Sequence, residues 1–180
     1  MNDVLHIEIA KQPDGSGVLR CTRKDGSVTW QKTRQGAHFA LHDLTHYTVE
    51  TALGYRQGFF GLIAAGWEVD DTTGKGNRGR LPDEALEVER IVGLFDAERG
   101  SGVLWSPEEF NRFAPRPLTP ADIVGVRALR ATLFEKWSQV PPGQKLELTF
   151  ELKAEHRPEL EREPASQTRG IPARGKKSLE

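Results

Sequence analysis

Residues 37–66 read AHFALHDLTHYTVETALGYRQGFFGLIAAG and form the longest run of the chain without a proline or a charge cluster. At about 100° per residue, His42, His46 and Glu50 fall on one helical face, one turn apart, with Asp43 at its edge. Apolar residues lie on both sides of this polar row. The pattern predicts a helix over about residues 39–53 that is buried on two sides.

The polar row has the composition of a metal site. Two histidines at positions i and i+4 can share one ion, because their side chains lie one turn apart on the same face. We therefore predict a divalent-metal site, typically zinc, with His42, His46 and Glu50 as ligands. In a hydrolytic enzyme, Glu50 or Asp43 would take the proton from a metal-bound water. Such a site also needs a carboxylate or histidine from another segment, for which the candidates are Glu68, Asp70, Asp71 and His6.

The same residues also fit a protein without catalytic chemistry. A buried histidine is often hydrogen-bonded within the core, and His46 and Glu50 form an ordinary i, i+4 pair. In this interpretation the histidines are structural. The chain would then be a binding or interaction module for a small-molecule ligand or a protein partner.

The segments that flank the helical region read as strands. Residues 4–10, 18–24 and 27–33 alternate between apolar and polar side chains, which predicts a three-stranded antiparallel meander. Asp25 and Gly26 are typical of a two-residue hairpin loop, and that loop would place Cys21 opposite Trp30. Residues 145–152 alternate in the same way and are expected to join this sheet.

Four further segments between the strands show helical signals. We predict helices over about residues 55–65, 82–100, 106–113 and 119–140, from apolar stripes, capping residues and prolines in first turns. Residues 67–81 are predicted to form a polar loop. Gly74, Gly76 and Gly79 match the G-x-G-x-x-G spacing there, but no buried strand precedes them, so we expect no nucleotide cofactor.

Together these elements predict an α+β fold. We expect one domain over residues 1–152, with an antiparallel sheet of about four strands and about four to five helices packed on one of its faces. Residues 153–180 are charged and rich in proline, so we expect a disordered tail there.

Composition excludes several functional classes. The chain has 25 basic and 26 acidic residues and a net charge of −1, so we expect no nucleic-acid partner. No apolar run is long enough to span a bilayer, and the single cysteine cannot form an intrachain disulfide. We therefore expect a soluble, cytoplasmic protein that has no membrane partner. No pattern in the sequence indicates an oligomeric state.

Overall fold

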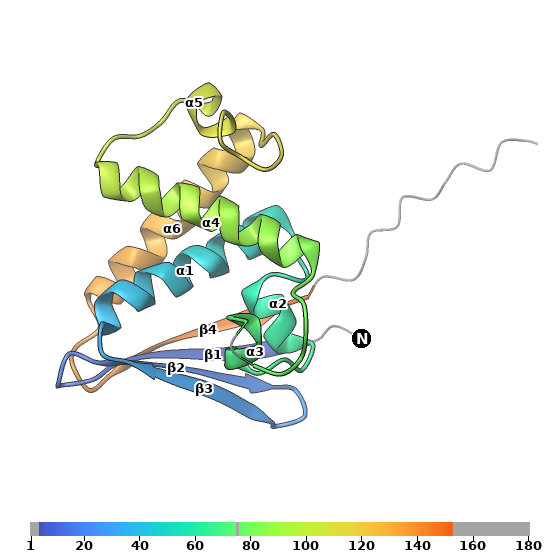
Figure 1. Cartoon of the computed structure of the whole chain (residues 1–180). Helices are drawn as coiled ribbons and strands as arrows, with labels where there is room; N and C mark the ends of the chain where they lie inside the picture. The colour runs from blue at the N-terminus through green and yellow to red at the C-terminus, as the bar shows by residue number, and fades with distance from the viewer. Residues whose placement is uncertain (1–3, 75, 153–180) are drawn as a thin grey trace, which may run out of the picture.

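A computed structural model describes residues 4–74 and 76–152 of the 180-residue chain. One antiparallel sheet carries the helices on one face, which confirms the predicted α+β class (Figure 1). The elements run in the order β1 (Val4–Lys11), β2 (Gly17–Arg23), β3 (Val28–Thr33), α1 (Gly36–Leu53), α2 (Phe59–Ala64), α3 (Val69–Thr72), α4 (Asp83–Ser101), α5 (Pro107–Asn111), α6 (Pro120–Ser138) and β4 (Lys145–Glu151).

The sheet has the order β3-β2-β1-β4, so the first strand lies in its interior. β1 pairs with β2 through Ile7 opposite Cys21, and with β4 through Leu5 opposite Phe150. Because side chains alternate along each strand, the buried apolar residues of β1, β2 and β4 share the face that the helices cover. The prediction that the last strand joins the N-terminal meander is confirmed.

The hairpin between β2 and β3 differs from the prediction by one residue. Arg23 N donates to Ser27 O at 2.9 Å, and Gly26, with φ of 83°, completes a three-residue loop instead of the two-residue loop that we expected. The longer loop places Cys21 opposite Thr29, so the predicted pairing of Cys21 with Trp30 is wrong. A slip of one residue exchanges the two faces of a strand, and Trp30 is accordingly 62% exposed on the outer face.

α1 lies between two hydrophobic cores. Leu44 belongs to the core that α1, α2 and the end of α6 form with the sheet, whereas Val49 belongs to the core that α1 forms with α4, α5 and the start of α6. The prediction of a helix buried on two sides is therefore confirmed. Gly17 and Gly36 fix its start against β2, since a Cβ on Gly36 would lie 2.4 Å from the backbone nitrogen of Gly17.

The remaining helices follow the sequence signals, with two exceptions. The helix predicted over about residues 55–65 begins only at Phe59. Residues 67–81, predicted to be a loop, contain the short helix α3, which a capping box between Glu68 and Asp71 begins. None of the described helices is long and apolar enough to cross a membrane. The predicted disordered tail, residues 153–180, lies outside the described residues.

Candidate metal centre

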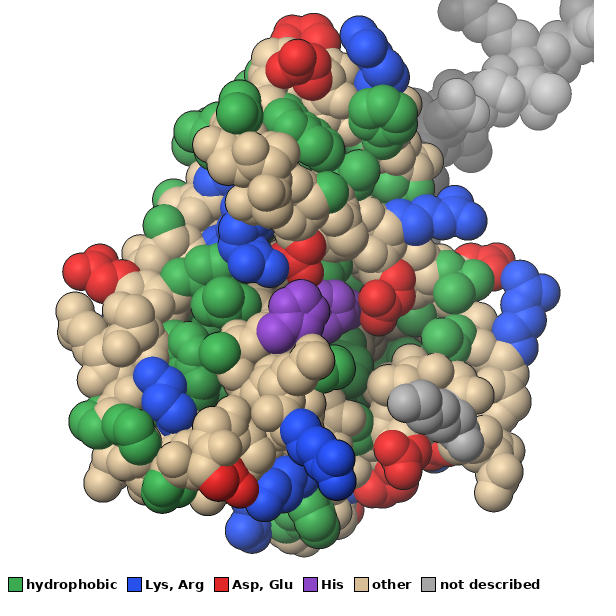
Figure 2. All heavy atoms as spheres, turned by 60° about the vertical axis from the view of Figure 1, so that its left-hand side comes forward, with side chains coloured by type: hydrophobic (Ala, Val, Ile, Leu, Met, Phe, Trp, Pro, Cys, Tyr) green, Lys and Arg blue, Asp and Glu red, His purple; other side chains and the backbone are tan. Residues whose placement is uncertain are grey.

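Three side chains from two helices meet on one flank of α1. His42 and His46 of α1 and Glu89 of α4 each offer a ligand atom, and these atoms all lie within 4.8 Å of one another. His46 faces Glu89, whereas His42 faces Asp96 further along α4, so the two helices run in opposite directions here. Figure 2 shows histidine side chains at the surface with acidic side chains beside them. The side chains of His42 and Glu89 are 34% and 46% exposed, so these two ligands are open to solvent, whereas His46 lies beneath them.

Asp96 orients the ring of His42. The Nδ1 atom of His42 lies 2.8 Å from Oδ2 of Asp96, and because an ionised carboxylate only accepts, Nδ1 carries the hydrogen. Thr45 Oγ1 donates to the other oxygen of Asp96 at 3.2 Å. Burial raises the pKa of Asp96, but the contacts with His42, Arg99 and Thr45 together outweigh it, so the net shift is downward. His42 is thereby left with Nε2 as the nitrogen that is free to bind a metal.

His46 lies between two carboxylates and is 2% exposed. Its Nδ1 atom is 3.5 Å from Oε1 of Glu50, and its Nε2 atom is 3.4 Å from Oε1 of Glu89. Burial lowers the pKa of His46, but the two carboxylates outweigh that effect and raise it to about 10. In the metal-free protein His46 is therefore an imidazolium at neutral pH.

Glu89 has the exposure and the charge that suit a ligand. Its side chain is 46% exposed. Burial raises the pKa of Glu89, but the contact with His46 and the charge of His42 together outweigh it, so the pKa is lowered. Two ligands bound tetrahedrally at about 2.1 Å from a zinc ion would lie about 3.4 Å apart. The observed separation of His46 Nε2 and Glu89 Oε1, 3.4 Å, equals that value.

Glu50, predicted as a third ligand or a base, makes a different set of contacts. Its carboxylate is 1% exposed and accepts from the backbone N–H groups of Phe60 at 3.2 Å and Gly61 at 3.0 Å. A Cβ on Gly58 would lie 2.5 Å from the Glu50 carboxylate carbon, so this glycine makes room for it. Glu50 thus holds α2 against α1 and balances the charge of His46, and its role as a ligand or base stays a prediction.

Asp43, the other predicted base, points towards the sheet. It is buried, and with Leu19 and Gly36 it lines a narrow cavity of about 10 Å³. Burial raises the pKa of Asp43 to about 7, against the opposing charges of His46 and His42. Asp43 is not part of the three-residue group that the described chain brings together. Its catalytic role also stays a prediction.

Neither Glu89 nor Asp96 of α4 was predicted as a ligand or partner from the sequence. The residues predicted as sources of a further ligand lie elsewhere: Glu68 pairs with Arg23 at 3.2 Å, and His6 is exposed on β1. Glu89 and Asp96 are two helical turns apart, so they share one face of α4, as the two histidines share one face of α1. That spacing beside an apolar stripe is the signal that could have identified them.

No known protein family, characterised protein or solved structure matches this chain. The residues of the site are therefore the basis for assigning a function.

Proposed function

We propose that the protein binds one divalent metal ion, zinc in the first place, through His42, His46 and Glu89, and that the site catalyses hydrolysis. The observation that carries this proposal is the convergence of one ligand atom from each of these three residues, all within 4.8 Å of one another. Asp96 holds the ring of His42 through Nδ1, as a carboxylate behind the ring holds many metal-binding histidines. Nδ1 of His46 lies 3.5 Å from Glu50 and has no hydrogen-bond partner among the described residues, while its Nε2 faces Glu89.

The number and type of the proposed ligands, two histidines and one glutamate, support a catalytic metal site more than a structural one. Structural zinc sites use four protein ligands, whereas catalytic sites use three, often two histidines and a glutamate, and leave a fourth position for water. A bound zinc ion lowers the pKa of that water to about 7, which supplies a nucleophile at neutral pH. The site therefore favours hydrolysis of a polar bond.

The surface above the ligands leaves room for a substrate. Gly93 lies on α4 between Glu89 and Asp96, on the same face, and is exposed. A Cβ added at Gly93 would meet no atom within 4 Å among the described residues. A glycine within a helix costs about 1 kcal/mol relative to alanine, and no packing contact requires it here. A glycine at position 93 keeps the approach of a substrate to the proposed metal position open.

A metal-content measurement tests this proposal. Protein that is dialysed against zinc and then against buffer should retain one zinc per chain by elemental analysis. Glu89→Gln should reduce the retained zinc, because it removes a charged ligand. Glu135→Gln, which changes an exposed helical carboxylate on α6, should not. Retention of no zinc by the unmodified protein would contradict the proposal.

A second candidate is a binding module in which the cluster is structural. It is favoured by the pKa of His46, about 10, which makes the residue a buried cation between Glu50 and Glu89. Such a triad can hold α1, α2 and α4 together without a metal. If the cluster has only this structural role, the dialysed protein should contain no zinc, and added zinc should leave its melting temperature unchanged.

A further inference from the structure

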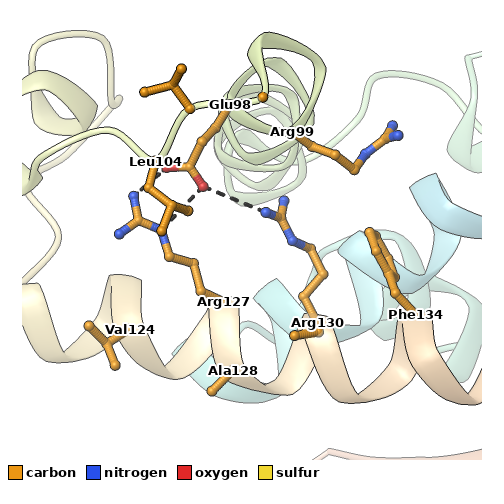
Figure 3. Close-up of a pocket in the computed structure, with 11 residues that line it drawn as sticks. Glu98, Arg99, Leu104, Val124, Arg127, Ala128, Arg130 and Phe134 are labelled. Carbon is orange, nitrogen blue, oxygen red and sulfur yellow. Dashed lines mark hydrogen bonds and ion pairs between the residues drawn. The ribbon is translucent and has the colours of Figure 1, made fainter.

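A second candidate site lies on the other side of α4. Its volume is about 590 Å³, and α4, α6 and the segment that follows α4 enclose it (Figure 3). Glu98 lines this pocket, whereas Asp96 serves the candidate metal centre. Two residues along a helix are separated by about 200° of rotation, so the two sites lie on nearly opposite sides of α4.

The walls of the pocket are apolar and unusually exposed. Val103 is 64% exposed, Leu104 is 72% exposed and Val124 is 61% exposed, and all three line it. The other apolar lining residues are Ala128, Ala131 and Phe134 of α6. Concave surfaces of this volume and apolar lining are typical of small-molecule sites.

The base of the pocket is an ionic network. Glu98 extends from α4 between Arg127 and Arg130 of α6, as Figure 3 shows. Arg127 Nε donates to Oε1 of Glu98 at 3.1 Å, and Arg127 Nη2 also donates to Oε2. Nη2 of Arg130 lies 3.6 Å from Oε1 of Glu98, and its Nη1 donates to Phe95 O at 2.6 Å. The network is therefore held rigidly from both helices.

The lining carries a surplus of positive charge. Three arginines, Arg99, Arg127 and Arg130, stand against the single carboxylate of Glu98. Asp96 neutralises Arg99, whose Nε lies 3.6 Å from Oδ1 of Asp96, which leaves one positive charge unbalanced. The pKa of Arg130 is lowered, mainly by burial, and Arg99 and Arg127 lower it further, against the effect of Glu98. Among the described residues, Nη1 of Arg127 has no hydrogen-bond acceptor.

We propose that this pocket binds a small amphipathic monocarboxylate. The alkyl or aryl group packs on Val103, Leu104 and Val124, and the carboxylate accepts from the free N–H groups of Arg127. One negative charge balances the surplus, and a charge-assisted hydrogen bond from Nη1 of Arg127, whose Nε and Nη2 already donate to Glu98, is stronger than a neutral one. A second copy of this chain is a poorer occupant, because a symmetric contact would bring the same surplus charges together.

Binding of octanoate, octan-1-ol and octylammonium, measured by calorimetric titration below their aggregation concentrations, tests the proposal. Octanoate should bind at least about tenfold more tightly than octan-1-ol, which corresponds to one charged hydrogen-bonded contact. Octylammonium should not bind detectably. Each methylene added between hexanoate and decanoate should tighten binding about three- to fourfold, as expected for burial of the chain.

A pair of variants on α6 locates the site. Ala128→Trp fills the pocket and should weaken octanoate binding at least about tenfold. Ala121→Trp changes a residue that is also exposed on α6 but does not line the pocket, and should leave octanoate binding unchanged. Because both alanines are exposed, both variants should fold as the parent does.

Three outcomes would overturn the proposal. The first is equal binding of octanoate and octylammonium, and the second is octanoate binding that Ala128→Trp does not affect. The third is a dimer in sedimentation that Ala128→Trp dissociates and octanoate does not, which would assign the pocket to a second copy of the chain.

Discussion

The Nδ1 atom of His42 lies 2.8 Å from Oδ2 of Asp96, although 54 positions separate the two residues in the sequence. This contact joins α1 to α4 and sets which turn of one helix faces which turn of the other. It also fixes the hydrogen on Nδ1 and leaves Nε2 of His42 for a ligand role. The candidate metal centre therefore depends on how α1 and α4 pack as much as on its ligands.

Replacing Asp96 by asparagine should weaken zinc binding about 10- to 100-fold, as loss of a carboxylate behind a metal-binding histidine usually does. Competition with a chromophoric chelator measures this change. Asp83→Asn is the matched control, because Asp83 is an exposed carboxylate on the same helix. Equal zinc affinity of the Asp96 variant and the parent would show that Asp96 does not orient a ligand.

Glu50→Gln should lower the free energy of unfolding of the metal-free protein by about 1–3 kcal/mol. It removes a charge that the backbone of α2 and the buried His46 both contact. Urea denaturation measures the change, with Glu135→Gln as the control. Loss of zinc binding without loss of stability would instead make Glu50 a ligand.

Asp43→Asn should change how stability depends on pH. The pKa of Asp43 is raised to about 7 in the folded protein from 3.8, so the folded state binds more protons than the unfolded state between these values. The contribution of Asp43 is therefore fully present below about pH 4 and is lost as the pH rises to about 7. Urea midpoints of the metal-free parent should fall more steeply over this window than those of Asp43→Asn. Parallel curves for the two proteins would contradict this assignment.

Gly93→Trp should cover the approach to the candidate metal centre, because nothing occupies the space beside this glycine. Release of zinc to an excess of chelator should slow in this variant, as followed by stopped-flow absorbance. Gly100→Trp is the control, since Gly100 is also exposed on α4 with no atom within 4 Å of an added Cβ. Equal release rates from both variants would place the approach elsewhere.

Much of the fold followed from local signals. Alternation identified the four strands, and capping residues placed the starts of α5 and α6 at Ser106 and Thr119. The hairpin was the exception, because Asp25-Gly26 fits both a two-residue and a three-residue loop. Only the packing of Thr29 against the helices decides between these two registers.

The candidate site was predictable only in part. A helical wheel groups His42 with His46, because their spacing is a property of one helix. It cannot show that Glu89 and Asp96 face them, since that depends on the side of α1 on which α4 packs. Nor can a helical wheel show that the carboxylate of Glu50 accepts hydrogen bonds from the backbone N–H groups of α2.

Anomalous scattering at the zinc absorption edge, from crystals grown with zinc, tests the central claim most directly. We predict one peak per chain, about 2.0–2.2 Å from Nε2 of His42, Nε2 of His46 and a carboxylate oxygen of Glu89. A chain with no peak among these three residues, in crystals that contain zinc, would contradict the assignment and favour a structural role for the histidines.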